Sequence, residues 1–347
     1  MRVYKLKKKG KRIYGLRFTP DSRQLLVVHG NKDSIKPNVA TWLDLAKGVQ
    51  TQTVSFYTDI YRGEAFAISS DHSRLVISNR VDHVSNLGNL IHWCNPRETP
   101  VQWHARDLEI NWSPETRSIR PFAIALTSDG NRMLAASEWQ LSTPESGYEG
   151  TVFSLTEHRF DTQTGSKHLT VDSHFNSQNY HSQIKSLAFA PDSKHWAAGY
   201  GKHWMESQGD GRRPNIDLFD QFGSEPLHSI ELKGTRIDYL TFSPDGRYLA
   251  AIAARTVIVL DANRLTTVSI LGSQSKQVNG IAFAPDSGKL LTVTNDGTVR
   301  VWDSTRAEII QTFDWNIGPL TAVAFSPDGT LCAAGGKEGQ IVLWDVD

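Results

Sequence analysis

The chain has 347 residues, 39% of them hydrophobic, and its 37 basic residues equal its 37 acidic ones in number. A neutral chain of this composition is typical of a globular protein, and its overall charge indicates neither a nucleic acid nor a membrane surface as partner. Because it has no run of about 18 apolar residues, we expect no transmembrane helix, and the basic N-terminus lacks the apolar segment of a secretory signal. We expect a cytoplasmic protein in which Cys94 and Cys332, from different predicted strands, are buried free thiols.

A turn between two apolar stretches recurs seven times along the chain. The turns read FTPDS at 18–22, ISSDH at 68–72, LTSDG at 126–130, FAPDS at 189–193, FSPDG at 242–246, FAPDS at 283–287 and FSPDG at 325–329, with aspartates Asp21, Asp71, Asp129, Asp192, Asp245, Asp286 and Asp328. Proline presets φ, aspartate supplies a side-chain acceptor and glycine permits a positive φ, so each turn predicts a tight hairpin. Repeats spaced by 41 to 63 residues are typical of a propeller or a solenoid.

After each turn comes a second landmark, a β-branched run that alternates with period two. These runs are NVATWLD at 38–44, NLIHWCN at 89–95, TVFSLTE at 151–157, NIDLFD at 215–220, VIVLD at 257–261, TVRVWD at 298–303 and QIVLWD at 340–345. Their alternation and their content of Val, Ile and Thr predict strands. Each repeat therefore predicts a blade of four antiparallel strands, joined by a turn, a variable loop and a second turn.

With these motifs the chain resembles the WD40 family, most closely at 278–347. The resemblance implies an all-β fold, a seven-bladed β-propeller of four-stranded antiparallel blades that forms one domain over residues 1–347. It also implies structural roles for Asp296 in a hairpin and for Trp302 and Trp344 in strands. The Gly-His dipeptide that the family places before each first strand is absent, and Ser273 stands where the family has histidine. We therefore expect that the family's buried hydrogen-bonded tetrad does not form completely.

The two ends of the chain predict how the ring closes. The sequence ends directly after the third strand of the seventh repeat, whereas RVYKL at 2–6 is a strand-like run that no inner strand precedes. Residues 2–6 match the outer-strand position that EIIQTF at 308–313 occupies in the preceding repeat. We expect residues 2–6 to complete the last blade and close the ring, which removes an exposed strand edge.

Loop length separates the first four repeats from the last three. The connection between second and third strands is minimal at 253–256, 295–298 and 337–340, but it is long at 29–38, 79–89, 137–150 and 200–215, and the adjoining loops 106–120 and 174–183 are expanded too. Tight hairpins suffice to build a blade, so the insertions predict a function. In a propeller both sets of loops emerge on the same, top, face, and insertions confined to one face are typical of a binding face.

The long loops are rich in the residue types that dominate interface hot spots. The candidate contact residues are Trp112, Trp139, Tyr148, Tyr180, His203, Trp204, Arg212 and Arg213. We interpret them as the binding surface of a non-enzymatic scaffold for another protein or peptide, itself a monomer. The alternative interpretation is that these aromatic side chains fix the long loops onto the ring.

The first twelve residues contain seven basic side chains and no acid. On the closure hypothesis, Lys8, Lys9 and Lys11 lie in a loop on the top face. With Arg212 and Arg213 they could bind phosphate or nucleic acid. The alternative is a solvated turn that keeps the closing strand soluble, and no interleaved aromatic residues or glycine-rich cradle favour a nucleic acid.

Catalytic and metal-binding motifs are not found. The twelve histidines form no HExxH set, and the chain has no CxxC, G-x-S-x-G or P-loop motif, so we expect no metal and no cofactor. A propeller hydrolase or lactonase with a central-channel site is the enzymatic alternative. It would need carboxylates and histidines on the inner strands, whereas these read GLRF, AFAI, AIAL, SLAF, YLTF, GIAF and AVAF.

Overall fold

The computed structural model describes residues 1–6, 12–30, 38–56, 66–69, 75–78, 91–94, 106–108, 116–142, 149–160, 167–173, 184–201, 215–220, 225–232, 236–272 and 276–346. These residues form an all-β structure without helices, in which 28 strands make seven four-stranded antiparallel sheets. The predicted four-stranded blades are confirmed. The chain divides into two compact units, unit 1 (Met1–Phe56 and Tyr239–Asp347) and unit 2 (Tyr57–Asp238), and closure of all blades into one ring stays a prediction.

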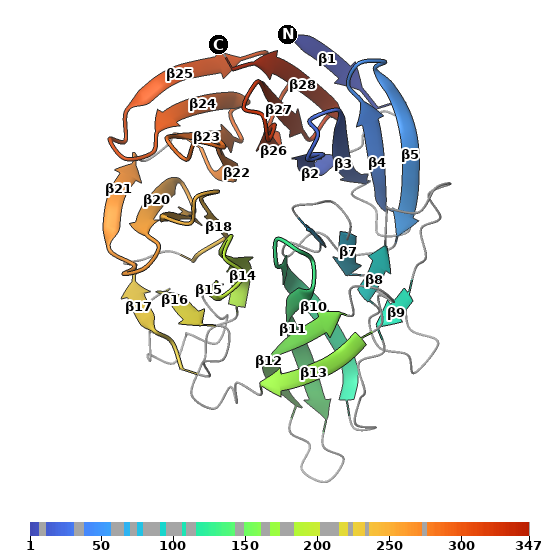
Figure 1. Ribbon diagram of the computed structural model, residues 1–347, viewed down its shortest axis with the longest axis vertical. Helices are drawn as coiled ribbons and strands as arrows, with labels where there is room; N and C mark the ends of the chain where they lie inside the picture. The colour runs from blue at the N-terminus through green and yellow to red at the C-terminus, as the bar shows by residue number, and fades with distance from the viewer. Residues whose placement is uncertain are drawn as a thin grey trace. The chain divides into compact units, whose positions relative to one another are not determined.

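Unit 1 holds four of the described sheets (Figure 1). Their strands are β2 Arg12–Phe18, β3 Gln24–Gly30, β4 Asn38–Asp44 and β5 Val49–Phe56; β18 Tyr239–Phe242, β19 Tyr248–Ala253, β20 Thr256–Asp261 and β21 Thr267–Leu271; β22 Val278–Phe283, β23 Lys289–Thr294, β24 Thr298–Asp303 and β25 Ile309–Asp314; and β26 Leu320–Phe325, β27 Leu331–Gly336, β28 Gln340–Asp345 and β1 Arg2–Lys5.

Unit 2 holds the other three described sheets. Their strands are β6 Phe66–Ile68, β7 Leu75–Ser78, β8 Ile91–Cys94 and β9 Arg106–Leu108; β10 Thr116–Leu126, β11 Arg132–Ser142, β12 Glu149–Phe160 and β13 Lys167–Ser173; and β14 Ile184–Phe189, β15 His195–Tyr200, β16 Asn215–Asp220 and β17 His228–Glu231.

The N-terminal strand completes the sheet formed by the C-terminal end of the chain. β1 pairs antiparallel with β28, with Val3 opposite Val342, and the amide of Leu6 donates to the carbonyl of Gly339 at 3.2 Å. Tyr4 and Leu6 pack against a buried apolar cluster that this sheet shares with the neighbouring β2–β5 sheet. The predicted pairing of residues 2–6 with the last blade is therefore confirmed, and it covers the free edge of β28.

Consecutive sheets of unit 1 are held together by apolar side chains from facing surfaces. One cluster joins the β26–β28 sheet to the β2–β5 sheet and contains Ile13, Leu16, Phe18, Leu25, Ala322, Ala324, Ile341 and Leu343. Two similar clusters join β22–β25 to β26–β28 and β18–β21 to β22–β25. The first strands contact one another in the order β18, β22, β26, β2, so they form one continuous row. Alternating apolar residues thus build the core between blades, as in stacked repeats.

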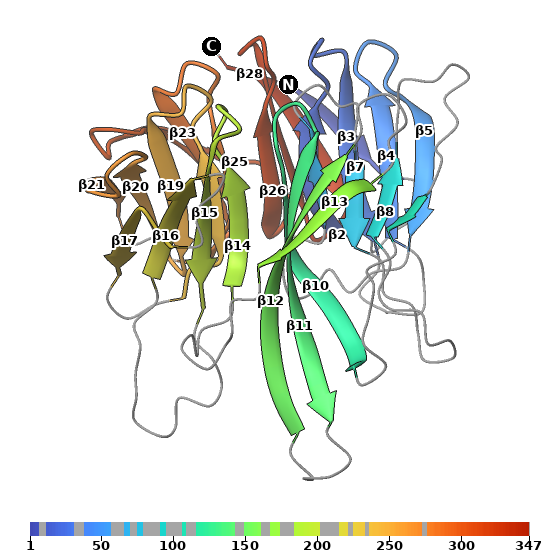
Figure 2. The ribbon, with the colours of Figure 1, turned by 60° about the horizontal axis from the view of Figure 1, so that its bottom comes forward.

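Unit 2 has the same construction, with one enlarged sheet. A buried cluster joins β10–β13 to β14–β17 and includes Ala123, Leu134, Leu187 and Trp196. β11 has 11 residues and β12 has 12, against six in each of β23 and β24. In Figure 2 the β11–β12 hairpin extends past the ends of β14 and β15.

Two expected loops are shorter than the sequence suggested. Residues 137–150 were expected to form a loop, but β11 continues to Ser142 and β12 begins at Glu149. Likewise the expected loop 106–120 contains β9 and the beginning of β10. β11 and β12 remain paired past the ends that we predicted for them, with Gln140 opposite Thr151, so residues expected in the loop belong to the strands. Cross-strand pairing overrides a local composition rich in Ser, Pro and Gly.

Candidate interaction surfaces

Each sheet has two opposite sides, formed by the ends of its strands, at which consecutive strands are connected. Because successive strands are antiparallel, the turns between first and second strands lie at the same edge as those between third and fourth strands. We call this the turn edge. The connections between second and third strands, and those between successive sheets, lie at the other edge, which we call the hairpin edge.

The turn aspartates organise the turn edge through hydrogen bonds to their own turns. In four turns a serine or threonine hydroxyl donates to the aspartate Oδ1 at 2.6 Å: Thr19 to Asp21, Thr127 to Asp129, Ser243 to Asp245 and Ser326 to Asp328. The same carboxylates accept the backbone amide two residues later at 3.0 Å, and those of Asp192 and Asp286 accept the corresponding amides at 2.8 and 2.9 Å. Each carboxylate thereby caps a backbone donor that the tight turn leaves without a strand partner. Asp71 lies outside the described residues.

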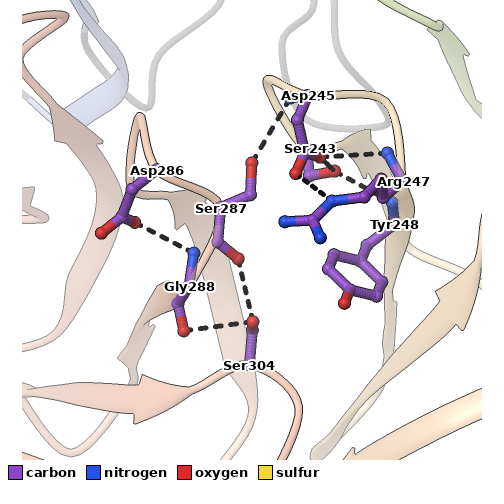
Figure 3. A network of polar contacts seen from close by, with 8 residues as sticks. All are labelled: Ser243, Asp245, Arg247, Tyr248, Asp286, Ser287, Gly288 and Ser304. Carbon is purple, nitrogen blue, oxygen red and sulfur yellow. Dashed lines mark hydrogen bonds and ion pairs between the residues drawn. The ribbon is translucent and has the colours of Figure 1, made fainter.

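Neighbouring sheets are also linked through these turns (Figure 3). The Asp245 amide donates to Ser287 Oγ at 3.3 Å, and the Asp328 amide donates to Ser22 Oγ at 3.4 Å. Ser304 Oγ donates to the carbonyl oxygens of Ser287 and Gly288 at 2.9 and 3.2 Å. Hydrogen bonds inside the fold therefore occupy polar groups of the turn edge in unit 1.

These contacts favour the ionised form of the turn carboxylates. Hydrogen bonds from the Ser326 hydroxyl and the Thr330 amide lower the pKa of Asp328 to about 2. Partial burial raises the pKa of Asp245, but the Ser243 hydroxyl and the Arg247 amide and side chain outweigh burial and lower it to about 2. A depressed pKa of this origin indicates a structural carboxylate rather than an acid–base catalyst.

The aspartates that end the third strands have a second capping role. Asp44, Asp261 and Asp303 each accept two consecutive backbone amides through Oδ1, at 2.8 to 3.0 Å. The turn that follows brings residues into the left-handed region, with Gly48 at φ 65°, Leu265 at 53° and Ala307 at 58°. The carboxylate thus stabilises a turn whose backbone is strained wherever the residue is not glycine.

Part of the tetrad expected for the family is present in the β22–β25 sheet. Trp302 Nε1 donates to Thr292 Oγ1 at 3.0 Å in a buried environment. At the hairpin edge of this sheet, Asp296 accepts the hydroxyl of Thr298 at 2.6 Å and forms an ion pair with Arg300 at 3.2 Å. The tryptophan therefore has a hydrogen-bond acceptor. Ser273 lies outside the described residues.

In unit 1 the described part of the hairpin edge is tightly connected. Asn279 Nδ2 donates to Asn295 Oδ1 at 3.1 Å and to the Leu320 carbonyl at 2.6 Å. Lys337 Nζ donates to Asn295 Oδ1 at 3.0 Å, so a side-chain network crosses from the β22–β25 sheet to the β26–β28 sheet. Short hairpins leave these groups close enough to bind one another.

In unit 2 the hairpin edge carries the elaborated segments. Trp139 lies within β11, opposite Val152 of β12, and so belongs to a strand rather than to the loop in which we expected it. The other candidate contact residues lie outside the described residues: Lys8, Lys9, Lys11, Trp112, Tyr148, Tyr180, His203, Trp204, Arg212 and Arg213.

Comparison with known families identifies the two repeats that the sequence follows most closely. Residues 265–303 and 307–345 each match the family described as WD domain, G-beta repeat, and they contain the Trp-Asp pairs that end β24 and β28. Residues 265–345 therefore contain two WD40 repeats. Two consecutive sheets of unit 1 thus carry the repeat signature, and the other sheets share the strand order without matching the family pattern.

Relatives of this chain include complex subunits. A WD repeat-containing protein of Synechocystis is 30% identical over 138 residues, 40% of this chain and 36% of the relative. The target of rapamycin complex subunit wat1 of Schizosaccharomyces pombe is 27% identical over 128 residues, 36% of this chain and 37% of the relative. The COMPASS component SWD1 of Saccharomyces cerevisiae is 33% identical over 102 residues, 26% of this chain and 24% of the relative. The match therefore spans about a third or less of the length of each relative.

Two features of this chain were missed in the sequence. The exposed side chain of Arg17 in β2 donates from Nη2 to the Tyr239 hydroxyl of β18 at 3.3 Å. In unit 2, Asp217 of β16 is 2% exposed, and burial raises its pKa despite hydrogen bonds from Ser229 and Tyr200. Arg17 had a detectable signal, because it is the one charged residue in the inner-strand motifs, whereas Asp217 resembles any polar residue of an alternating strand.

Within the part of the chain that the structure describes, no three His, Cys, Asp or Glu side chains gather as metal ligands. The described residues also include no helix that is long and apolar enough to cross a membrane. Cys332 is buried, and desolvation raises the pKa of its thiol.

Proposed function

We propose that this protein is a non-enzymatic scaffold that binds another protein or peptide through the hairpin edge of its elaborated sheets. The observation that carries the proposal is the contrast between the two edges. At the turn edge, carboxylates and hydroxyls bind the protein's own backbone, whereas the hairpin edge carries the insertions. Insertions on one side of a repeat array are typical of its binding side.

The β11–β12 hairpin is the described part of this surface. Its strands are about twice as long as those of the short blades, and the extra length is not needed to build a four-stranded sheet. Trp139 lies in the extension, and tryptophan contributes large binding energies when an interface covers it. Two relatives that are named as subunits of complexes support the choice of a protein partner.

The test is capture from native lysate with tagged protein. A variant in which Asn-Gly replaces residues 138–153 joins Ser137 to Ser154 through a two-residue turn and removes the extension, including Trp139, while keeping the register. A second variant combines Trp139→Ala, Trp204→Ala, Arg212→Ala and Arg213→Ala. The matched control is Arg247→Gln with Arg306→Gln, which removes exposed charges from the turn edge.

We expect the wild type and the control to recover the same partner, and the two hairpin-edge variants to lose it while melting normally. Equal recovery with all four proteins would contradict the proposed binding surface. Turnover of a substrate by the purified wild-type chain would contradict the non-enzymatic part of the proposal.

A further inference from the structure

The first strands of the seven repeats can be aligned on their turn aspartates. Four residues before the aspartate, five repeats have alanine, one has Thr241 and one has Arg17; the alanines are Ala67, Ala125, Ala188, Ala282 and Ala324. Six residues before the aspartate, six repeats have Gly, Ala or Ser, and one has Tyr239. Each of these two layers therefore consists of small side chains with one large exception.

The large exceptions contact each other. Arg17 and Tyr239 are 222 residues apart in the chain, and the Arg17 Nη2 to Tyr239 hydroxyl distance is 3.3 Å. β2 and β18 are the two ends of the row of first strands in unit 1, so the side chains meet across the row. Arg17 is exposed and Tyr239 is half-buried, and Arg17 Nη1 also donates to its neighbouring carbonyl of Leu16 at 3.2 Å.

The hydrogen bond between Arg17 and Tyr239 adds little by itself to the stability of unit 1. A hydrogen bond between exposed groups contributes roughly 0.5–1 kcal/mol, and the apolar clusters already hold the sheets of unit 1 together. An arginine at this position is too large for the close packing of first strands that alanine permits in the other repeats. The exposed guanidinium of Arg17 carries five N–H donors and lies beside the phenol hydroxyl of Tyr239.

The charge of the surrounding segment favours an anion. Residues 1–56 contain 12 basic and three acidic residues, and unit 1 as a whole contains 20 basic and 14 acidic residues. Of the acids in residues 1–56, Asp21 and Asp44 cap backbone amides at the turn edge. Arg17 therefore belongs to a segment whose sequence carries a strong excess of positive charge, which favours an anionic ligand.

We propose that Arg17 and Tyr239 form a binding site for the side-chain carboxylates of an acidic peptide segment. The guanidinium binds a carboxylate through two parallel hydrogen bonds, and the Tyr239 hydroxyl donates a further one. This proposal rests on the proposed function, because the acidic segment belongs to the scaffold's partner. It adds a site on the first strands, separate from the extended hairpin.

The experiment is fluorescence anisotropy of the full chain with a fluorescein-labelled peptide of five Glu-Ser-Gly repeats, at about 150 mM salt to screen distant charges. The same peptide with glutamine in place of glutamate is the ligand control. Arg17→Gln should weaken binding about tenfold or more, and Arg17→Lys about three- to tenfold, because lysine keeps the charge but not the paired geometry. Tyr239→Phe should weaken it about two- to fivefold.

Arg23→Gln is the matched control, because it removes one exposed charge at the turn edge next to β2. We expect it to change affinity less than twofold and the glutamine peptide not to bind. Equal weakening by Arg23→Gln and Arg17→Gln, no binding of the glutamate peptide, or Arg17-dependent binding of an oligonucleotide instead of the peptide would each overturn the proposal. Capture of a lysate partner by the Arg17→Gln variant, after the peptide has failed to bind, would leave the scaffold function standing and reject this site.

Discussion

The two units are built from the same four-stranded sheets, but they differ in the lengths of their strands and of the connections between them. In three of the four sheets of unit 1, strands of about six residues are joined by minimal hairpins at 254–255, 295–297 and 337–339, and side chains at this edge bind one another, whereas the connection between β3 and β4 spans residues 31–37. In unit 2, the turn edge keeps its capping carboxylates Asp129 and Asp192, while β11 and β12 double in length. Hydrogen bonds of the fold thus hold the turn edge in both units, whereas the length of the connections at the hairpin edge differs from sheet to sheet.

Charge separates the units as well. Unit 1 has 20 basic and 14 acidic residues, whereas unit 2 has 17 basic and 23 acidic residues. The chain is neutral only because these two imbalances cancel, so its net charge conceals a basic unit 1 and an acidic unit 2. Net charge computed over a whole chain is a poor guide to the surface of one part.

The largest effect that we expect comes from unit 1, where deletion of residues 1–6 removes β1. The sheet of β26–β28 then exposes the edge of β28, and the packing of Tyr4 and Leu6 is lost. Burial of two such side chains contributes about 3 kcal/mol, so the melting temperature should fall by at least about 5 °C. Differential scanning fluorimetry measures this. An unchanged melt would show that β1 does not stabilise its sheet, and Arg2→Gln with Lys5→Gln, which keeps the strand, is the control.

A smaller effect distinguishes the buried tryptophans of the two units. Trp302 in unit 1 donates to a side chain, Thr292, whereas Trp196 in unit 2 donates to the backbone carbonyl of Asp220 at 3.1 Å. Thr292→Val therefore leaves a buried N–H without this acceptor and should cost about 1–3 kcal/mol in urea unfolding. Thr312→Val on the exposed strand β25 is the control and should cost less than about 0.5 kcal/mol. Equal costs would show that the Trp302 hydrogen bond adds no stability.

Two carboxylates, Asp245 in unit 1 and Asp217 in unit 2, should respond to pH with opposite signs. The pKa of Asp245 is about 2 in the folded chain, below its ordinary value of 3.8, so the stability that the ionised carboxylate contributes is present above pH 4 and is lost as pH falls toward 2. Asp245→Asn should then destabilise by roughly 1 kcal/mol at pH 7 and by less near pH 2.

Asp217 should behave in the reverse way, because burial raises its pKa in the folded state. Its ionisation destabilises the fold as pH rises through the folded pKa, and asparagine has no charge to bury. Asp217→Asn should therefore raise the urea midpoint at pH 7, and the gain should vanish below about pH 4. A loss of stability at pH 7 would mean that the charged carboxylate is favoured at this position.

The smallest effect concerns serines that replace glycine in the turns. Ser193 in unit 2 has φ 57° and Ser287 in unit 1 has φ 62°, a region that glycine adopts without strain. Ser193→Gly should stabilise the chain by about 0.5–1 kcal/mol. Ser287→Gly should be nearly neutral, because it also removes the buried acceptor of the Asp245 amide. If both variants raised the melting temperature equally, the hydrogen bond from the Asp245 amide to Ser287 would contribute nothing to stability.

The sequence predicts the blades well because their turns are local. Pro-Asp-Gly and Pro-Asp-Ser specify hairpins by themselves, and residues 2–6 could be placed because they match an outer strand with no inner strands beside it. The extension of β11 and β12 could not be predicted, since Pro144 and Gly147 indicate a loop and only cross-strand pairing shows where the strands end. The Arg17–Tyr239 contact depends on the curvature of a row of four strands, which no local pattern encodes.

The most direct test of the two-edge account is hydrogen–deuterium exchange of the full chain with and without the partner captured from lysate. The account predicts slower exchange at the hairpin edge, in residues 79–90, 137–150 and 202–214, when the partner is bound. It predicts unchanged exchange at the turn edge, in residues 19–23, 243–248 and 326–331. Protection of the turns with no change at the hairpin edge would contradict the assignment of binding to the elaborated edge.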